Sequence, residues 1–239
     1  MKLQKFEFER KRGKYDSLIA VGGKVYDSSY DAHSIDIYDF CCESLKDLRL
    51  AHIKTWPDLY SSDVGYCETR TSFTDNSLYA LALNCRMLQI IDLSFTGCSR
   101  DWPSEIGFTQ EGFLVLIQSC PIRVLVLNNA NFFDDEGMKA LASSPHLETL
   151  ELILCHAVTD AGMRFIAHSP CLSNLALRMC HNVTDVGVAE LGRVHKLESL
   201  VIEYCGEISL EAAQGVAKSV HYSKDCSDAL MNTIGLGAY

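Results

Sequence analysis

The sequence predicts an α/β solenoid, a chain wound into successive coils that each contribute one strand and one helix. A pattern of apolar residues and cysteine returns at a constant spacing in the second half of the chain. Its clearest copies are Leu147-x-x-Leu150-x-Leu152-x-x-Cys155, Leu172-x-x-Leu175-x-Leu177-x-x-Cys180 and Leu197-x-x-Leu200-x-Ile202-x-x-Cys205. The pattern also continues in the same way, because Val158-Thr159-Asp160-Ala161-Gly162-Met163 matches Val183-Thr184-Asp185-Val186-Gly187-Val188. Each repeat therefore includes a turn and a helix as well as a strand.

A period near 25 with this spacing of leucines is typical of a leucine-rich repeat. Earlier copies follow the same spacing: Ile122-x-x-Leu125-x-Leu127, then Leu88-x-x-Ile91-x-Leu93 and, more faintly, Leu45-x-x-Leu48-x-Leu50. We expect a horseshoe of about 5–7 coils, with a parallel concave sheet and convex helices. The array is predicted to cover residues 41–220. The organisation of residues 56–70 is not predicted, since the step from Leu45 to Leu88 fits neither one period nor two.

The alternation of inward and outward residues predicts the strand of each coil. In the copy that begins at Leu147, Leu150 and Leu152 are expected to point into the solenoid. The residues between and beside them, Thr149, Glu151 and Ile153, are expected to line the concave face. The cysteine that closes each copy is expected to face inward as a buried free thiol.

The helix of each coil is read from its first residues. Thr159 is expected to be the N-cap, and Asp160 suits the positive end of the helix dipole. Gly162 is expected to allow close packing of the helix on the turn. An apolar stripe then buries the helix against the leucines, as with Met163, Ile166 and Ala167.

The two ends of the chain are expected to cap the array. Residues 1–40 form an N-terminal segment in which Leu18-Ile19-Ala20-Val21-Gly22-Gly23-Lys24-Val25-Tyr26 predicts two short strands around a Gly-Gly turn. Residues 221–239 are expected to be a C-terminal cap or tail, because an open solenoid must cover its last hydrophobic edge.

Composition narrows the class of protein. The 239 residues are 48% hydrophobic, with no apolar run of the roughly 18 residues that a membrane span needs. No apolar block follows the basic segment from Met1 to Lys14, which argues against a secretory signal. Eleven cysteines without an export signal then point to a reducing compartment, so we expect a cytoplasmic or nuclear protein. The net charge of −10 disfavours a nucleic-acid partner.

The sequence carries no recognisable catalytic or metal-binding motif. The chain has no Gly-x-Ser-x-Gly, His-Glu-x-x-His or Cys-x-x-Cys pattern, so we expect neither an enzyme nor a bound cofactor. Cys155-His156 and Cys180-His181 bring Cys/His pairs onto neighbouring coils. However, adjacent residues on an extended backbone point to opposite sides, so inward cysteines leave the histidines outward and a tetrahedral zinc site is not expected.

The combination of a period near 25, a closing cysteine and a Thr-Asp-x-Gly helix start resembles the cysteine-containing leucine-rich repeats of F-box proteins. Looser copies of the helix start are Thr74-Asp75-Asn76-Ser77-Leu78 and Thr109-Gln110-Glu111-Gly112-Phe113. The resemblance covers about two thirds of the chain. It implies a substrate receptor of an SCF-type ubiquitin ligase, in which an F-box binds the Skp adaptor of the cullin and the repeats hold the protein to be ubiquitylated. Residues 1–40 depart from the family, because they do not match its Leu- and Pro-marked F-box.

Protein binding on the concave face and its loops is the function that we expect. Stacking the repeats puts Asp92, Val126, Glu151, Ala176 and Val201 in one exposed column, and Ser94, Asn128, Ile153, Arg178 and Glu203 in the next. A third column at the end of the strands holds Phe95, Asn129, Leu154, Met179 and Tyr204, a nearly continuous apolar ridge. Trp102, in an insertion, is a further contact candidate. The residues that we select as partner-binding are Phe95, Trp102, Asn129, Glu151, Ile153, Leu154, Arg178, Met179, Glu203 and Tyr204.

Two alternatives stay open. The insertion around residues 99–107 or the tail from Tyr222 to Tyr239 could cover the ridge instead of a partner. The module could also be a stand-alone interaction scaffold that is not coupled to a ligase.

Overall fold

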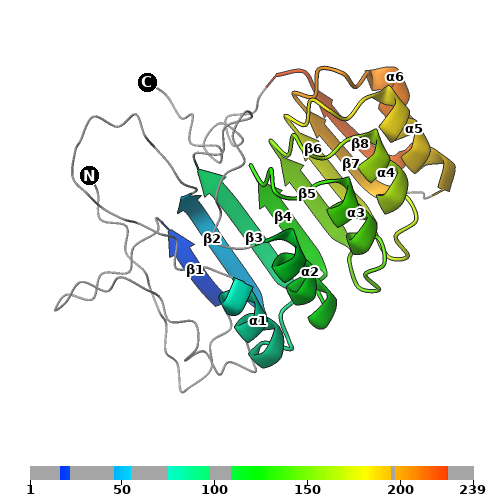
Figure 1. Cartoon of the computed structure of the whole chain (residues 1–239). Coiled ribbons are helices and arrows are strands. Elements are labelled where there is room, and N and C mark those ends of the chain that lie inside the picture. Colours follow the sequence, from blue (N-terminus) through cyan, green and yellow to red (C-terminus); the bar gives the residue numbers. More distant parts are fainter. Residues whose placement is uncertain (1–16, 22–45, 55–74, 97–108, 195–196, 226–239) are drawn as a thin grey trace, which may run out of the picture. The chain divides into compact units, whose positions relative to one another are not determined.

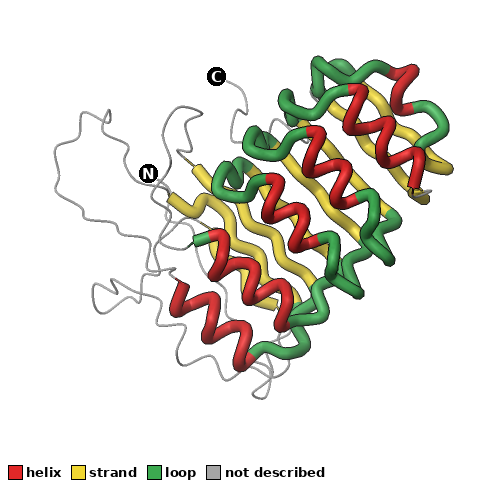
Figure 2. The backbone as a smooth tube through the Cα atoms, turned by 45° about the vertical axis from the view of Figure 1, so that its right-hand side comes forward, coloured by secondary structure: helices red, strands yellow, loops and turns green. Residues whose placement is uncertain are grey.

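The computed structural model describes residues 17–21, 46–54, 75–96, 109–194 and 197–225. They fall into two compact units, residues 1–122 (unit 1) and residues 123–239 (unit 2). In each unit, parallel strands form a sheet and the helices lie in a layer on one of its faces (Figures 1 and 2). The predicted leucine-rich-repeat solenoid is therefore confirmed.

Unit 1 contains the strands β1 (Ser17–Val21), β2 (Asp47–Lys54) and β3 (Ile90–Thr96) and the helices α1 (Asp75–Asn84) and α2 (Gln110–Ser119). β1 pairs with β2 in parallel, and β2 pairs with β3 in parallel, with a register shift between Leu50 and Ile53. The hairpin prediction for residues 18–26 missed the parallel pairing of β1 with β2. Its second strand, residues 24–26, lies outside the described residues, as do residues 56–70.

Unit 2 repeats the strand and helix with greater regularity. Its strands are β4 (Val124–Asn128), β5 (Thr149–Ile153), β6 (Asn174–Arg178), β7 (Leu197–Glu203) and β8 (Ala217–Ser223). Its helices are α3 (Asp135–Leu141), α4 (Asp160–Ile166), α5 (Asp185–Val194) and the four-residue α6 (Leu210–Ala213). Each strand pairs in parallel with the next, and from β4 to β7 the register places each repeat position beside its equivalent on the next coil. β8 extends past residue 220, where we expected the array to end.

The core consists of the residues that the repeat pattern selects. The inward leucines and isoleucines of the strands are buried in unit 2, and the helix stripe packs on them. Met163, Ile166 and Ala167 of α4 are all buried, as predicted.

An aspartate at the start of the helices α1, α3, α4 and α5 links one coil to the next within a unit. The carboxylate of Asp160 accepts hydrogen bonds from the backbone N–H and the hydroxyl of Thr184, both at 2.8 Å. The same paired contact joins Asp75 to Thr109, Asp135 to Thr159 and Asp185 to Ser209. Thr109, Thr159 and Ser209 are helix N-caps, so the next coil's cap is itself fixed by the preceding coil. We call this series the aspartate ladder.

The glycine of the Thr-Asp-x-Gly motif makes room for the aspartate ladder. A Cβ on Gly162 would lie 2.5 Å from Oδ1 of Asp135, and a Cβ on Gly187 would lie 2.5 Å from Oδ1 of Asp160. In unit 1, the three atoms nearest to a Cβ on Gly112 all belong to Asp75, with Oδ1 at 2.1 Å, Cγ at 2.7 Å and Cβ at 3.3 Å. The expectation that Gly162 allows close packing is therefore confirmed, and the group that needs the space is the ladder carboxylate.

The closing cysteines are buried free thiols. Each thiol donates to a backbone carbonyl of the preceding coil: Cys155 to Leu127, Cys180 to Leu152 and Cys205 to Leu177, at 3.4 to 3.5 Å. Burial raises the pKa of Cys205 from 9.0 to about 11, and it raises the pKa of Cys180 well above 9.0. Cys180 and Cys205 are therefore protonated at neutral pH, where only the thiolate is nucleophilic.

The aspartate ladder and its glycine should be energetically coupled. We expect Gly112→Ala to lower the free energy of unfolding by about 1–3 kcal/mol, because the new methyl group collides with Asp75. In an Asp75→Gly background, which removes all three colliding atoms, the same change should be neutral or stabilise by up to about 1 kcal/mol, since alanine is the better helix former. A double-mutant cycle by chemical denaturation measures the coupling. Additive effects of the two changes would contradict the contact.

The buried thiols should make stability depend on pH in the alkaline range. Because the folded pKa of Cys205 lies above its unfolded value, the stabilisation is complete below pH 9 and is lost as the pH rises from 9 towards about 11. We expect the free energy of unfolding of the wild type to fall by about 1–2 kcal/mol more over this range than that of Cys205→Ala. Tyrosine and lysine titrate in both proteins, so the difference between the two profiles isolates the thiol. Parallel profiles would show that Cys205 does not contribute.

Candidate protein-binding surface

Three of the selected residues meet on neighbouring strands of the sheet of unit 2. The strand register places Glu203 beside Arg178, and it places Glu151 beside Ala176, two residues before Arg178. The Nη1 atom of Arg178 pairs with Glu151, and its Nε donates to Glu203 at 2.9 Å. One arginine therefore holds two carboxylates in a half-buried ion-pair network.

His221 on β8 extends this network and was not predicted. Its Nε2 lies 3.4 Å from Oε1 of Glu203. The leucine pattern does not continue after β7, so the sequence does not predict a strand at residues 217–223.

Three of the selected residues are buried instead of lining an exposed face. Phe95 is only 3% exposed, because β3 runs on to Thr96 and Phe95 continues the inward row of Ile91 and Leu93. Ile153 is 2% exposed, although it lies between Asn128 and Arg178 in the register of the neighbouring strands, and Glu203 is 6% exposed. All three expectations of exposure were wrong.

The remaining members of the third column share an unusual backbone conformation. Asn129, Leu154, Met179 and Tyr204 have φ angles of 57°, 55°, 55° and 53°, in the left-handed region. This region suits glycine and asparagine and costs other residues roughly 1 kcal/mol or more. Unit 2 nevertheless has large apolar side chains here on three successive coils. We call Leu154, Met179 and Tyr204 the loop ridge.

The backbone of the loop ridge is held by the next strand. The N–H groups of Leu154, Met179 and Tyr204 each donate at 2.9 Å, to the carbonyls of Arg178, Glu203 and Ser223. Their side chains are partly accessible, and Tyr204 is 44% exposed. The fold thus fixes the backbone at these positions and leaves the side chains at the surface.

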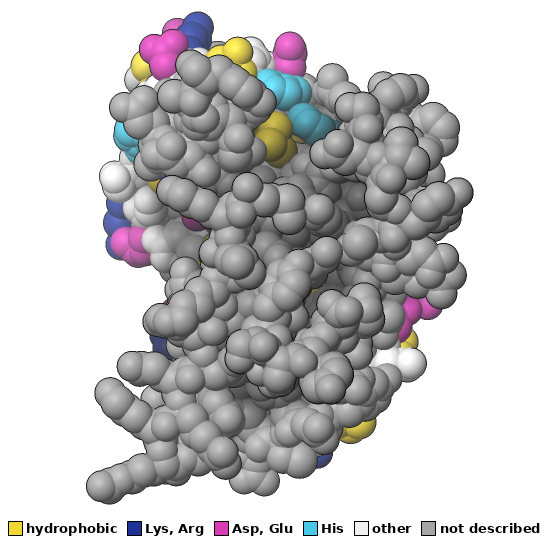
Figure 3. Space-filling view, turned by 90° about the vertical axis from the view of Figure 1, so that its left-hand side faces the viewer, with side chains coloured by type: hydrophobic (Ala, Val, Ile, Leu, Met, Phe, Trp, Pro, Cys, Tyr) yellow, Lys and Arg dark blue, Asp and Glu magenta, His cyan; other side chains and the backbone are white. Residues whose placement is uncertain are grey.

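An aromatic stack lies next to the loop ridge. The rings of His156 and His181 are stacked, with centroids 5.8 Å apart, and His181 meets Tyr204 edge to face at 6.0 Å. Figure 3 shows histidine side chains grouped beside hydrophobic ones on one face of the molecule. Among the described residues, no group of three or more His, Cys, Asp and Glu side chains is arranged to hold a metal ion.

Trp102 and the two segments proposed to cover the ridge lie outside the described residues, except for the start of the tail in β8. In the part of the chain that the structure describes, no helix is long and apolar enough to cross a membrane.

Comparison with known proteins identifies the repeat. A family model described as Leucine Rich repeat matches residues 118–142 and 143–167. A chain in the crystal structure of the Rad7 and Elc1 complex in yeast aligns with 81% of this chain at 18% identity, with a TM-score of 0.46. A chain in the crystal structure of the TLR13–ssRNA13 complex aligns with 80% of it at 11% identity, with a TM-score of 0.25. This chain spans 60% and 38% of the lengths of those two chains. The repeats indicate a protein-binding module.

The left-handed backbone of the loop ridge should be visible in the stability of variants. We expect the free energy of unfolding of Met179→Val to be about 1–2 kcal/mol lower than that of Met179→Asn. A branched Cβ is incompatible with this conformation, whereas asparagine tolerates it. Denaturation of both variants and the wild type measures the difference. The matched pair Val188→Ile and Val188→Asn, at a buried helical position, should show the opposite order. The same order at both positions would contradict the left-handed conformation of Met179.

Proposed function

We propose that this chain is the substrate-recognition part of an SCF-type ubiquitin-ligase receptor acting in ubiquitin-dependent protein degradation. In this proposal, a protein substrate binds to the loop ridge and the adjoining concave face of unit 2. The observation that supports this assignment of the binding surface is the loop ridge itself. Large apolar side chains occupy three backbone positions where asparagine or glycine would cost the fold less. Such a cost is expected where the side chain serves a partner.

The ligase part of the proposal is supported by the repeat chemistry. The Thr-Asp-x-Gly helix start and the closing cysteine carry the resemblance to the F-box repeat family. Both elements have defined structural tasks here, in the aspartate ladder and in the inward thiols. The resemblance therefore rests on residues that build the coil, which supports a shared type of module.

A stand-alone interaction scaffold is the second candidate function. Residues 17–21 form the strand β1, which pairs with β2, so this part of the N-terminal segment belongs to the sheet and not to a helical F-box. A strand at this place supports a repeat module that does not contact an adaptor through residues 17–21. Both candidates use the same surface of unit 2.

Binding to the Skp adaptor separates the two candidates. We expect the purified chain to bind the adaptor, alone or with a cullin present, with a Kd of about 1 µM or tighter if it is a ligase receptor. Isothermal titration of the folded chain with the purified adaptor is the measurement, and circular dichroism checks that the chain is folded. The absence of binding with both components present would leave the scaffold function.

A further inference from the structure

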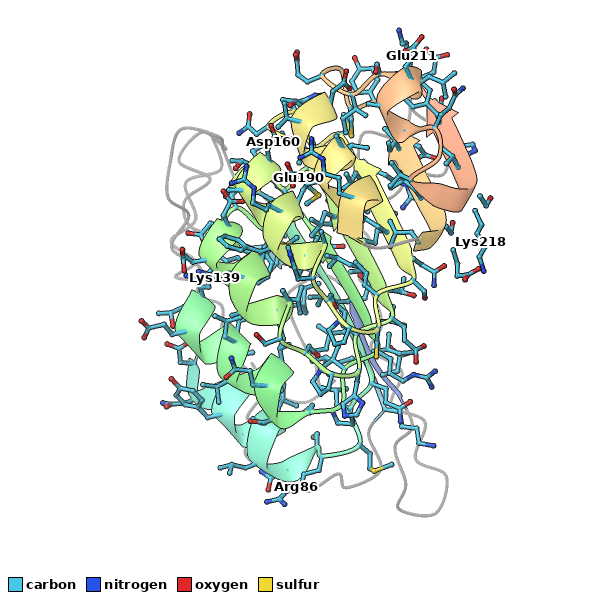
Figure 4. All side chains as sticks on the ribbon, turned by 90° about the vertical axis from the view of Figure 1, so that its right-hand side faces the viewer. Arg86, Lys139, Asp160, Glu190, Glu211 and Lys218 are labelled. Carbon is cyan, nitrogen blue, oxygen red and sulfur yellow. The ribbon has the colours of Figure 1, made fainter. Side chains whose placement is uncertain are left out.

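The edge of unit 2 at the carboxyl ends of its strands is acidic. In the described chain from Val126 onwards, the carboxyl-terminal halves of the strands and the loops up to the first residue of each helix carry eight acidic and two basic residues. The acidic residues are Asp134, Asp135, Glu151, Asp160, Asp185, Glu203, Glu207 and Asp225, and the basic ones are Arg178 and Lys224. The opposite ends of the helices carry Lys139, Arg164 and Arg193 in their last turns. Figure 4 shows Asp160 and Lys218 on opposite sides of unit 2. A partner at the carboxyl edge therefore meets a negative field.

The same edge carries the exposed apolar side chains of unit 2. Among its described residues, the large hydrophobic side chains that are exposed are Val186, Tyr204 and Leu210, at 58%, 44% and 42%. Tyr204 belongs to the loop ridge, while Val186 and Leu210 lie in the first turns of α5 and α6. We call the eight acidic residues of this edge the acidic rim. Together with the exposed apolar groups, they form a surface that a partner with both apolar and basic groups would match.

The spacing of the loop ridge selects the form of that partner. Equivalent residues on adjacent parallel strands lie about 4.8 Å apart, so Leu154 and Tyr204 are separated by about 10 Å. An α-helix presents one side chain per turn of about 5.4 Å, which is about 11 Å over two turns. An extended peptide repeats its side chains on one face at about 6.7 Å, which gives about 13 Å over two steps. The helical repeat fits the ridge more closely.

Hydrogen bonding supports the same choice. An extended peptide gains affinity by pairing its backbone with free backbone groups. The N–H groups of Leu154, Met179 and Tyr204 are already bonded to the next strand. A helix needs no such groups, because its own backbone is satisfied internally.

We propose that the loop ridge of unit 2 binds an amphipathic helix of a partner protein, with an apolar stripe on the ridge and Lys or Arg side chains beside the stripe. The stripe repeats about every 3.5 residues and contacts Leu154, Met179 and Tyr204. The basic side chains face the acidic rim, of which Glu207 is an exposed member three residues after Tyr204. This inference rests on the proposed function only in needing the same surface to bind protein.

The test uses synthetic helices as probes on the full chain. The first probe is a fluorescent peptide of about 18 residues with leucines at helical spacing and lysines beside them, and the second has glutamates in place of the lysines. A third peptide has the composition of the first in scrambled order. Fluorescence anisotropy should show the lysine peptide binding at least about 10-fold more tightly than either of the others.

Variants locate the binding on the loop ridge. The double variant Met179→Asn and Tyr204→Asn should bind the lysine peptide about 10-fold or more weakly than the wild type. Asparagine is chosen because it tolerates the left-handed backbone. The folded state of this variant is checked by its unfolding midpoint. Glu207→Lys should weaken binding of the lysine peptide and strengthen binding of the glutamate peptide. Glu198→Lys makes the same charge change at the amino end of β7. It should alter the Kd of neither peptide by more than about 2-fold.

Three results would overturn the inference. The lysine peptide does not bind, it binds the double variant as well as the wild type, or sedimentation shows a dimer that the double variant abolishes. In the last case a second copy of the chain, whose opposite edge has basic helix ends, is the occupant. Failure of the peptide with retained adaptor binding would leave the ligase proposal standing. Peptide binding without adaptor binding would leave the surface standing and remove the ligase.

Discussion

The paired hydrogen bond between a helix-start aspartate and the N-cap of the next coil is the contact on which the regularity of both units depends. It connects three requirements in one motif. The N-cap residue supplies a hydroxyl and an N–H, the aspartate supplies two acceptor oxygens, and a glycine two residues after the aspartate leaves space for the preceding coil's carboxylate. A carboxylate at a helix start also interacts favourably with the helix dipole. Each coil is therefore capped from outside, and its helix begins where its neighbour's helix begins.

Common helix starts in turn align the strand ends. Within unit 2, the constant register brings Arg178 between Glu151 and Glu203, and it brings Leu154, Met179 and Tyr204 into one row. The candidate surface is therefore a product of the repeat itself. Side chains that are far apart in the sequence become neighbours because successive coils have the same length.

The coil could be predicted from the sequence because its signals are local and repeated. Leu150, Leu152, Cys155, Thr159 and Gly162 each recur at the same spacing, and each occupies its expected place. The candidate surface was predictable only as a set of positions. The burial of Phe95 depends on where β3 ends, and the contact of His221 with Glu203 depends on a strand outside the leucine pattern. The left-handed conformation could not be foreseen either, because Leu, Met and Tyr are not residues that indicate it.

One backbone conformation occurs with four different side chains in unit 2, those of Asn129, Leu154, Met179 and Tyr204. The coil thus specifies the main chain at this point through its neighbours and not through the residue that occupies it. Such a position can exchange side chains during evolution without a new fold, as the binding loops of antibodies do on their constant framework. A family of proteins built on this coil could diversify its partners by changing one residue per repeat, and the repeat number would set how many such choices are available.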